Sequence, residues 1–200
     1  MIKYITTFVL FFFDYFHKKK IINFLKKNLN ILSIDILLDI GAHKGESIKF
    51  FSKNLKIKKI FSFEASFDNF NNLKKKFKNK NNLILENLAL SSEETEKKFN
   101  QCKETSSSTF SEINVDSKYF KKKLKFFNST NYENFFEEKI VKTNTLDKYL
   151  NENKIKNIDL IKIDTEGHEF EILKGLKENI KNVKTIIFEH HYDNMIKKKY

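Results

Sequence analysis

The sequence predicts an α/β fold of the Rossmann-like type, in which one parallel sheet carries helices on both faces. Short apolar runs alternate with helical patterns from Ile31 onward. Acids stand at the ends of two of these runs, in ILLDI (36–40) and IFSFE (60–64), and two glycines follow the first. Alternating strands and helices are typical of parallel βαβ units with crossover connections.

The strands are expected where apolar residues are continuous, and the helices where apolar residues recur every three or four positions. In the first helix, Ile48, Phe51 and Leu55 share one face, and in the second Phe70, Leu73 and Phe77 do so. The expected elements are, in order, a strand at 36–40, a helix at 47–55, a strand at 60–64, a helix at 67–77, a strand beginning at 83–85, a strand at 158–164, a helix at 169–176 and a strand at 185–189.

An excursion at 91–157 departs from this alternation. It holds a polar stretch and then KIVKTNTLDKYL (139–150), which predicts a strand leading into a capped helix. Because it is too long for a bare loop, we expect it to carry small strands and to house substrate specificity. The domain assignment is therefore an amino-terminal helical segment at 1–30 and a Rossmann-like domain at 31–200.

Composition narrows the class of protein. Two hundred residues suit one domain, and the single cysteine, Cys102, excludes an internal disulfide and suits a reducing, cytoplasmic location. The formal net charge is +12, but every basic residue is lysine. Recognition of bases or phosphates favours arginine forks. We therefore interpret the charge as a solvated surface and expect no nucleic acid partner.

The amino-terminal stretch Tyr4–Phe16 is apolar but too short to span a bilayer, and no cleavage site for a signal peptide follows it. Two interpretations stay open. The favoured one is a helix packed on the domain or on a partner subunit, which would make a homo-oligomer. The other is an interfacial helix, peripheral at the inner membrane face, with Lys18, Lys19 and Lys20 toward anionic headgroups.

The glycines indicate a ligand site after the first strand. Gly41 and Gly45 lie in DIGAHKG (39–45), where Gly41 permits a sharp turn close to a ligand and Gly45 permits close packing of the helix start. Helix-start amides there favour an anionic group such as a carboxylate. The spacing matches neither the G-x-G-x-x-G nicotinamide motif nor a P-loop. The motif fits a ligand with a carboxylate and a ribose but no phosphate.

Glu64 completes this first constellation. It ends the second strand, where an acid can accept hydrogen bonds from both ribose hydroxyls. Asp39 and Glu64 together also place negative charge beside a ligand that carries a sulfonium cation.

A second constellation spans 162–169, in KIDTEGHE. Lys162 and Asp164 stand in an apolar strand, which is costly unless they are paired, and we expect Lys162 to neutralise a buried acid. Parallel strands bring their carboxyl ends to one edge, where ligands bind. The rim expected there consists of Asp39, His43, Glu64, Asp164, Glu166, His168, Glu189 and His190.

These segments resemble the FkbM family of S-adenosylmethionine-dependent methyltransferases. The resemblance runs over about 36–189 and rests on LLDIGAHKGES, FSFEAS, NLAL, TNTLDKYL and, most specifically, IDLIKIDTEGHEFEILKG. It implies a class I methyltransferase sheet, S-adenosyl-L-methionine as cofactor, and O-methylation of a hydroxyl on a sugar, glycolipid or polyketide-like acceptor.

The resemblance also implies roles for individual residues. It implies that the methionine end of the cofactor is bound by Asp39, Gly41, Ala42 and Gly45. It also implies that Glu64 binds the ribose and that Asn87 and Leu88 border the adenine. The residues implied to face the transferable methyl are Asp164, Glu166 and His168.

Three departures from the family pattern stand out. His43 replaces a frequent Asn, and Ala65 replaces the usual Pro. Third, the chain ends at Tyr200, before the helix and two strands that usually complete the sheet, so we expect either a fragment, which is favoured, or completion of the edge by a partner.

The expected reaction is an in-line displacement, in which a substrate oxygen attacks the sulfonium methyl. A base of near-neutral pKa would take the hydroxyl proton, with His168 preferred, then Glu166 and then Glu189. The alternative role for His168 is a helix-start residue bonded to a backbone carbonyl.

Two other classes of protein stay open. A divalent metal could use Asp164, Glu166, His168 and His190, although no established metal-ligand spacing is present and none is predicted. A non-enzymatic, lysine-rich membrane-associated module would leave the Gly41 turn and the carboxylates without a purpose. Cys102 has no neighbouring histidine in sequence, so a nucleophilic thiol is unsupported.

Overall fold

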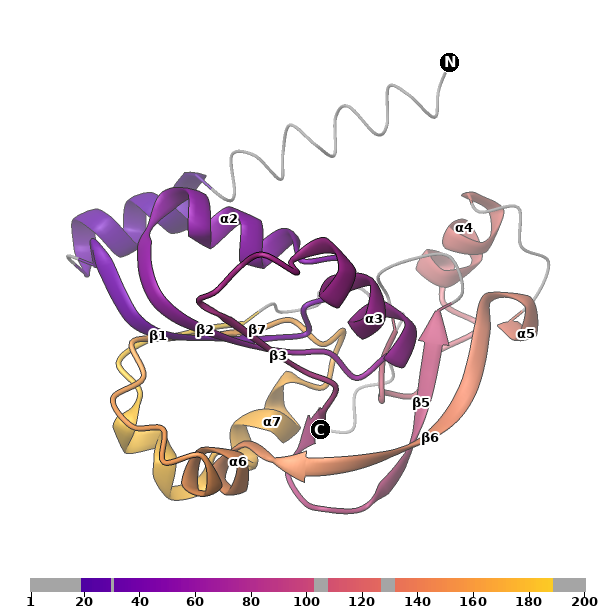
Figure 1. The fold of residues 1–200 in the computed structure, drawn as a ribbon. Coiled ribbons are helices and arrows are strands. Elements are labelled where there is room, and N and C mark those ends of the chain that lie inside the picture. Colours follow the sequence, from indigo (N-terminus) through magenta and orange to yellow (C-terminus); the bar gives the residue numbers. More distant parts are fainter. Residues whose placement is uncertain (1–18, 30, 103–107, 127–131, 189–200) are drawn as a thin grey trace.

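The computed structural model describes residues 19–29, 31–102, 108–126 and 132–188 (Figure 1). The predictions for Tyr4–Phe16, Lys18, Glu189 and His190 lie outside these ranges. Among the helices of the described ranges, none is long and apolar enough to cross a membrane.

A five-stranded parallel sheet forms the centre of the molecule, in the order β3-β2-β1-β7-β8. Its strands are β1 (Ser33–Ile40), β2 (Lys56–Phe63), β3 (Leu83–Glu86), β7 (Leu160–Ile163) and β8 (Ile186–Phe188). The chain builds outward from β1 through β2 to β3 and then returns to the other side of β1. The strand order therefore reverses between β1 and β7, which is the switch point where doubly wound sheets bind ligands.

Helices cover both faces of this sheet, which confirms the predicted Rossmann-like α/β fold (Figure 1). One face carries α2 (Glu46–Asn54) and α3 (Phe67–Lys76), together with a helical segment at 19–23 that continues into η1 (Phe24–Asn28). The other face carries α6 (Leu146–Glu152) and α7 (Glu169–Lys174), and η2 (Lys177–Asn182) follows α7.

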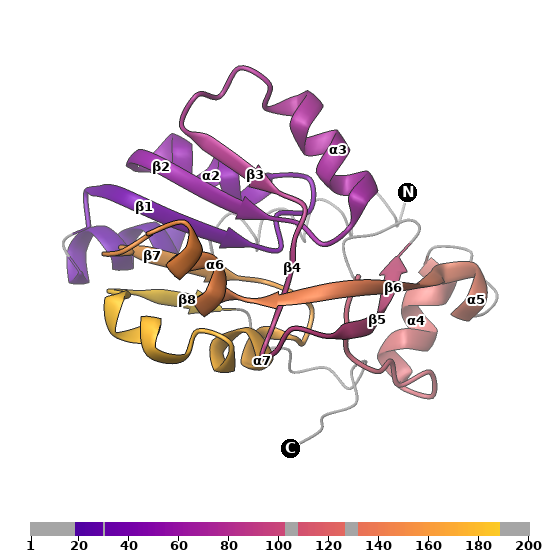
Figure 2. The same ribbon diagram turned by 60° about the horizontal axis from the view of Figure 1, so that its bottom comes forward.

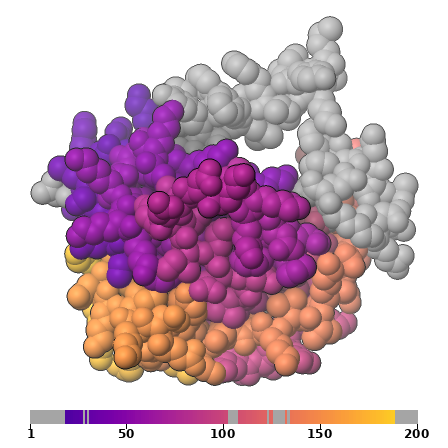
Figure 3. Space-filling view, in the orientation of Figure 1, coloured from indigo at the N-terminus to yellow at the C-terminus, as the bar shows by residue number. Residues whose placement is uncertain are grey.

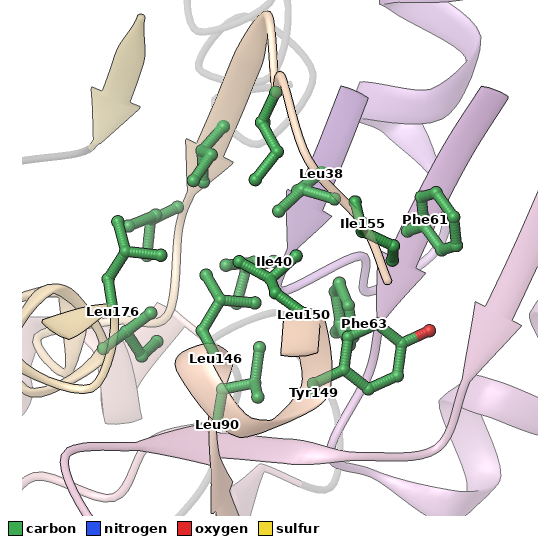
Figure 4. Close-up of a cluster of buried hydrophobic side chains, with 14 residues drawn as sticks. Leu38, Ile40, Phe61, Phe63, Leu90, Leu146, Tyr149, Leu150, Ile155 and Leu176 are labelled. Atoms are coloured by element: carbon green, nitrogen blue, oxygen red, sulfur yellow. The ribbon is translucent and has the colours of Figure 1, made fainter. Parts of the chain in front are cut away.

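The core consists of two apolar layers, one on each side of the sheet. Leu37 belongs to the layer under α2 and α3, whereas Leu38 belongs to the layer over α6 and α7. Successive side chains of a strand point to opposite faces, so a strand buried on both faces needs an unbroken apolar run. Figure 4 shows the second layer, where Leu38 and Ile40 of β1 meet Leu146 and Leu150 of α6.

The first two strands begin earlier than the apolar pattern predicts. β1 starts at Ser33 and β2 at Lys56, and these two residues are partners in the ladder. Their amino-terminal halves include exposed polar side chains. In these halves the apolar residues, such as Ile34 and Ile57, alternate with polar ones, so a continuous apolar run locates only the second half of each strand.

The excursion carries two strands of its own, as expected, and they form a three-stranded sheet, in the order β4-β6-β5, with a short strand that begins just before it. The elements of this region are β4 (Ala89–Ser91), β5 (Glu96–Cys102), α4 (Lys118–Phe126), α5 (Tyr132–Phe135) and β6 (Phe136–Thr145). β6 leads directly into α6, where the Thr145 side chain caps the helix by accepting a hydrogen bond from the backbone N–H of Lys148. The predicted strand and capped helix at 139–150 are therefore confirmed.

The β5–β6 ribbon extends past the carboxyl ends of the central strands and carries α4 and α5 at its far end (Figure 2). A small apolar cluster that includes Phe120, Phe135 and Phe136 holds that end together. In the space-filling view, the excursion and the main sheet form one continuous body (Figure 3).

Candidate functional site

A cavity opens at the carboxyl ends of β1, β2 and β7, at the switch point of the sheet. Its wall combines the three segments that follow these strands with residues of the excursion. The lining residues are Ile40, Gly41, His43, Phe63, Glu64, Ala65, Asn69, Leu88, Ala89, Leu90, Phe99, Ser108, Phe110, Asp164, Thr165, Glu166, His168 and Ile172.

Gly41 joins the two motifs that the sequence singled out. Its φ is +81°, and a Cβ at this position would lie 1.9 Å from the backbone oxygen of Asp164. The Nζ of Lys162 also donates a hydrogen bond to the carbonyl of Gly41, at 3.1 Å. A sharp turn was predicted here, but the close approach that requires glycine is made by the end of β7.

The backbone amides of the Gly41–Gly45 loop bind the chain's own acceptors. The N–H of His43 donates to Oε2 of Glu64 at 2.7 Å, and the N–H of Lys44 donates to Oε2 of Glu46 at 3.2 Å. We expected amides at this helix start to receive the carboxylate of a ligand. The amides of His43 and Lys44, which precede the helix, already bind carboxylates of the protein, so the expectation stays a prediction for the first amides of α2 itself.

Glu64 lies at the cavity wall with 7% of its surface exposed. Its Oε1 accepts from the N–H of Ser66 at 2.9 Å, while Oε2 holds His43. Burial raises the pKa of Glu64, and the amides of Ser66 and His43 oppose that rise. The Asn69 side chain also hydrogen-bonds Glu64, so of the roughly four acceptor positions of a carboxylate only a minority is left for a hydroxyl group of a ligand.

Asp39 lies behind the cavity wall, fully buried. Its Oδ2 accepts hydrogen bonds from the hydroxyls of Ser47 at 2.8 Å and Ser62 at 3.0 Å. Its Oδ1 lies 3.5 Å from the Nζ of Lys162, which also lies 3.2 Å from Asp164. Burial alone would lower the pKa of Lys162, but the charges of Asp39 and Asp164 outweigh it and raise that pKa. The prediction that Lys162 neutralises a buried acid is confirmed.

Three further residues predicted to hold the cofactor also lie outside the lining. Ala42 is buried in the core under α2. Gly45 has a φ of +78° and faces the Phe77 ring, so the predicted close packing of this helix start is confirmed. Asn87 donates hydrogen bonds to the carbonyls of Glu64 and Ala65 and thereby joins the segments after β2 and β3. Of the predicted cofactor residues, Gly41, Glu64 and Leu88 line the cavity.

The turn after β7 brings Asp164, Glu166 and His168 to the cavity, as predicted. The side chain of Glu169 stabilises this turn, because its Oε1 accepts hydrogen bonds from the backbone N–H groups of Thr165 and Gly167. Two residues of the excursion also stabilise the turn by hydrogen bonds. Thr109 donates its hydroxyl proton to the carbonyl of Glu166 at 2.6 Å, and Ser111 does the same for Gly167 at 2.9 Å.

His168 differs from its predicted state. It is 6% exposed, its ring lies 5.0 Å from that of Phe110, and its Nε2 lies 3.0 Å from the hydroxyl of Ser91. Burial, followed by the charge of Lys97, lowers its pKa to about 4. The expected near-neutral pKa is therefore wrong, because the sequence alone did not show that the excursion covers this side chain. Its ring nitrogen also meets a hydroxyl in place of the backbone carbonyl considered as the alternative.

Sequence reasoning missed the residues that the excursion adds to the site. Phe99, Ser108 and Phe110 line the cavity, and Ser91 and Lys97 surround His168. One signal was present, since Phe99 and Phe110 are isolated aromatic residues within a polar stretch. Aromatic side chains in a polar stretch usually pack against other apolar groups, and here Phe99 and Phe110 do so at the wall of the cavity.

The described ranges contain no group of three His, Cys, Asp or Glu side chains that could hold a metal ion. The metal alternative required Asp164, Glu166 and His168 together with His190. Within the described part of the chain, the first three do not form such a site, and the Nε2 of His168 is turned to Ser91.

The fold and the cavity define a Rossmann-like α/β protein with a cavity at the switch point of its sheet. The match of residues 39–198 to the methyltransferase FkbM domain places the chain in that family, which confirms the resemblance. No curated protein shows significant similarity to the chain. Among solved structures it is similar to the methyltransferase FkbM from Methylobacillus flagellatus KT, with 15% identity and a TM-score of 0.47. The similarity covers 78% of this chain and 33% of that one, so this chain spans about a third of its length.

Proposed function

We propose that the protein is an S-adenosylmethionine-dependent methyltransferase that methylates a hydroxyl group of a sugar, glycolipid or polyketide-like small molecule. The observation that carries this proposal is the sign of the charges around the cavity. Glu64, Asp164 and Glu166 line it, whereas no lysine is among its described lining residues in a chain that has 38 basic residues. Such a lining attracts a sulfonium cation and repels the phosphates of a nucleotide.

The residues present also fit the rest of that cofactor. Glu64 keeps an acceptor position for a ribose hydroxyl, and Leu88, Leu90 and Phe99 offer an apolar surface for a base. When bound, S-adenosylmethionine supplies a methyl group attached to positively charged sulfur. The contributions of the protein are to orient the two reactants and to exclude water.

The hydroxyl proton needs a destination when the oxygen–carbon bond forms and the carbon–sulfur bond breaks. Asp164 is our first candidate, because its side chain lines the cavity and is 36% exposed, while Lys162 holds it from behind at 3.2 Å. Glu166, on the same turn, is the second. Both acids belong to the predicted catalytic set. His168 is not chosen as the proton acceptor, because its Nε2 already meets the hydroxyl of Ser91.

Calorimetric titration of the purified chain with S-adenosylmethionine, and separately with NAD, tests this proposal. We expect saturable binding of the methyl donor alone and a loss of at least about tenfold in affinity in Glu64→Gln. Glu86→Gln is the matched control, because Glu86 ends the neighbouring strand β3 and is absent from the cavity lining. Absence of donor binding by a folded chain, or equal affinities of the two variants, would overturn the proposal.

A further inference from the structure

The environment of His168 decides where its proton lies. Ser91, the last residue of β4, is fully buried, and its Oγ lies 3.0 Å from the Nε2 of His168. The Nζ of Lys97, on β5, donates to the same Oγ, also at 3.0 Å. Among the described residues, these are the two hydrogen-bonding neighbours of the Ser91 hydroxyl.

The chemistry of the three groups permits one arrangement that satisfies them all. The Lys97 ammonium can only donate, so the Ser91 oxygen accepts from it. The single hydroxyl proton of Ser91 then has Nε2 of His168 as its remaining acceptor. A buried hydroxyl with an unpaired proton is unfavourable. Nε2 is therefore unprotonated, and the neutral imidazole carries its proton on Nδ1.

Protonation of Nε2 would break this arrangement. The Ser91 oxygen would then face two cationic donors, and its own proton would lose its acceptor. The other charged groups around the ring do not reverse this preference. Glu171 on α7 is hydrogen-bonded to Ser92 at 2.6 Å and to Lys174 at 2.8 Å, and Glu93 lies 3.7 Å from Lys97 itself.

We propose that Ser91 and Lys97 are positioning residues that hold His168 as the neutral Nδ1–H tautomer, so that His168 serves the cavity as a hydrogen-bond donor. This inference deepens the proposed function and rests on it for its catalytic meaning. A ring held in this way donates its N–H to an oxygen or nitrogen in the cavity and leaves the hydroxyl proton to Asp164 or Glu166. The tautomer itself depends only on contacts within the protein.

Nitrogen-15 NMR of the chain with labelled histidines tests the tautomer without any ligand. The chain has five histidines, and the signal absent from His168→Gln identifies His168. We expect the Nδ1–H pattern at pH 7, preserved down to about pH 5. In Lys97→Met we expect an upward shift of the His168 pKa by about half a unit or more. In Ser91→Ala we expect a mixture of tautomers.

Lys98→Met is the matched control, because Lys98 follows on the same strand and pairs with Glu138 at the surface. It should leave the His168 signals unchanged. An Nε2–H pattern in the wild type, titration near pH 6.5, or equal effects of Lys97→Met and Lys98→Met would overturn the inference. Lys97→Met keeps the test decisive if Ser91→Ala does not fold. Because no methyl donor is used, failure here is distinguishable from failure of the proposed function.

Discussion

Lys162 connects the two chain segments that form the site, one at the end of β1 and one after β7. It stands between Asp39 at the end of β1 and Asp164 after β7, and it donates to the carbonyl of Gly41. The Oδ1 of Asp39 is buried and, in the described structure, has no hydrogen-bond partner, so the charge of Lys162 is its compensation. A buried carboxylate that loses its cation is strongly destabilising.

Replacing Lys162 by Met should therefore lower the free energy of unfolding by about 3 kcal/mol, as measured by urea titration. Lys58→Met is the control, because Lys58 pairs with Asp35 on the surface with most of its side chain exposed. Surface pairs contribute little, so this variant should unfold like the wild type. Similar losses in the two variants would contradict the role assigned to Lys162. Adding Asp39→Asn to Lys162→Met should restore part of the stability.

At the scale of elements, the packing of α2 against the end of α3 depends on a single glycine. Gly45 precedes α2 in the left-handed conformation, and a Cβ there would come within 2.3 Å of the Phe77 ring. This contact places the start of α2, and with it the His43 amide that holds Glu64. The motif that the sequence predicted to hold a ligand thus also joins two helices.

Gly45→Ala should destabilise the protein by about 2 kcal/mol or more, because a left-handed alanine is strained and its methyl overlaps the ring. Thermal unfolding measures the loss. Gly45→Ala combined with Phe77→Leu removes the ring edge and should recover part of it. Lys44→Ala, at the exposed neighbouring position, should change little. A Gly45→Ala variant as stable as Lys44→Ala would show that the two helices can separate without cost.

The elements that the sequence predicted well are those whose signal is local. The apolar run 36–40, the Thr145 cap and the Gly41 turn each depend on neighbouring residues, and all three are present. The cover over His168 depends on pairing of 96–102 with 136–142, which no local pattern encodes. For the same reason the sequence indicated the acids of the site but missed Ser91 and Lys97.

At the scale of the whole molecule, the excursion covers the carboxyl ends of the central strands, so that a cavity forms there in place of an open surface. Its strands bring Ser91, Lys97 and Phe99 over the carboxyl ends of the central strands. His168, at the end of the turn after β7, is consequently shielded from solvent, and its ionisation becomes linked to folding.

Stability should therefore depend on pH through His168. Its pKa is about 4 in the folded protein against an ordinary 6.5. Between these values the unfolded chain binds the proton more tightly, so the contribution is complete above pH 6.5 and is lost as pH falls toward 4. The linked loss is at most about 3 kcal/mol.

Chemical denaturation at pH 7.5 and pH 5 measures this linkage. The wild type should lose more stability between the two conditions than His168→Gln, which cannot bind that proton. Parallel losses in the wild type and His168→Gln would contradict a buried neutral His168.

The contact between Gly41 and the end of β7 has a consequence for synthesis of the protein on the ribosome. The carbonyl of Gly41 and the ammonium of Lys162 are 121 residues apart in sequence, and β1 lies between β2 and β7. A nascent chain that has emerged only through α6 can pair β1 with β2, and β2 with β3, but the other edge of β1 stays open. The cavity at the switch point therefore closes only when the last quarter of the chain inserts beside the first strand.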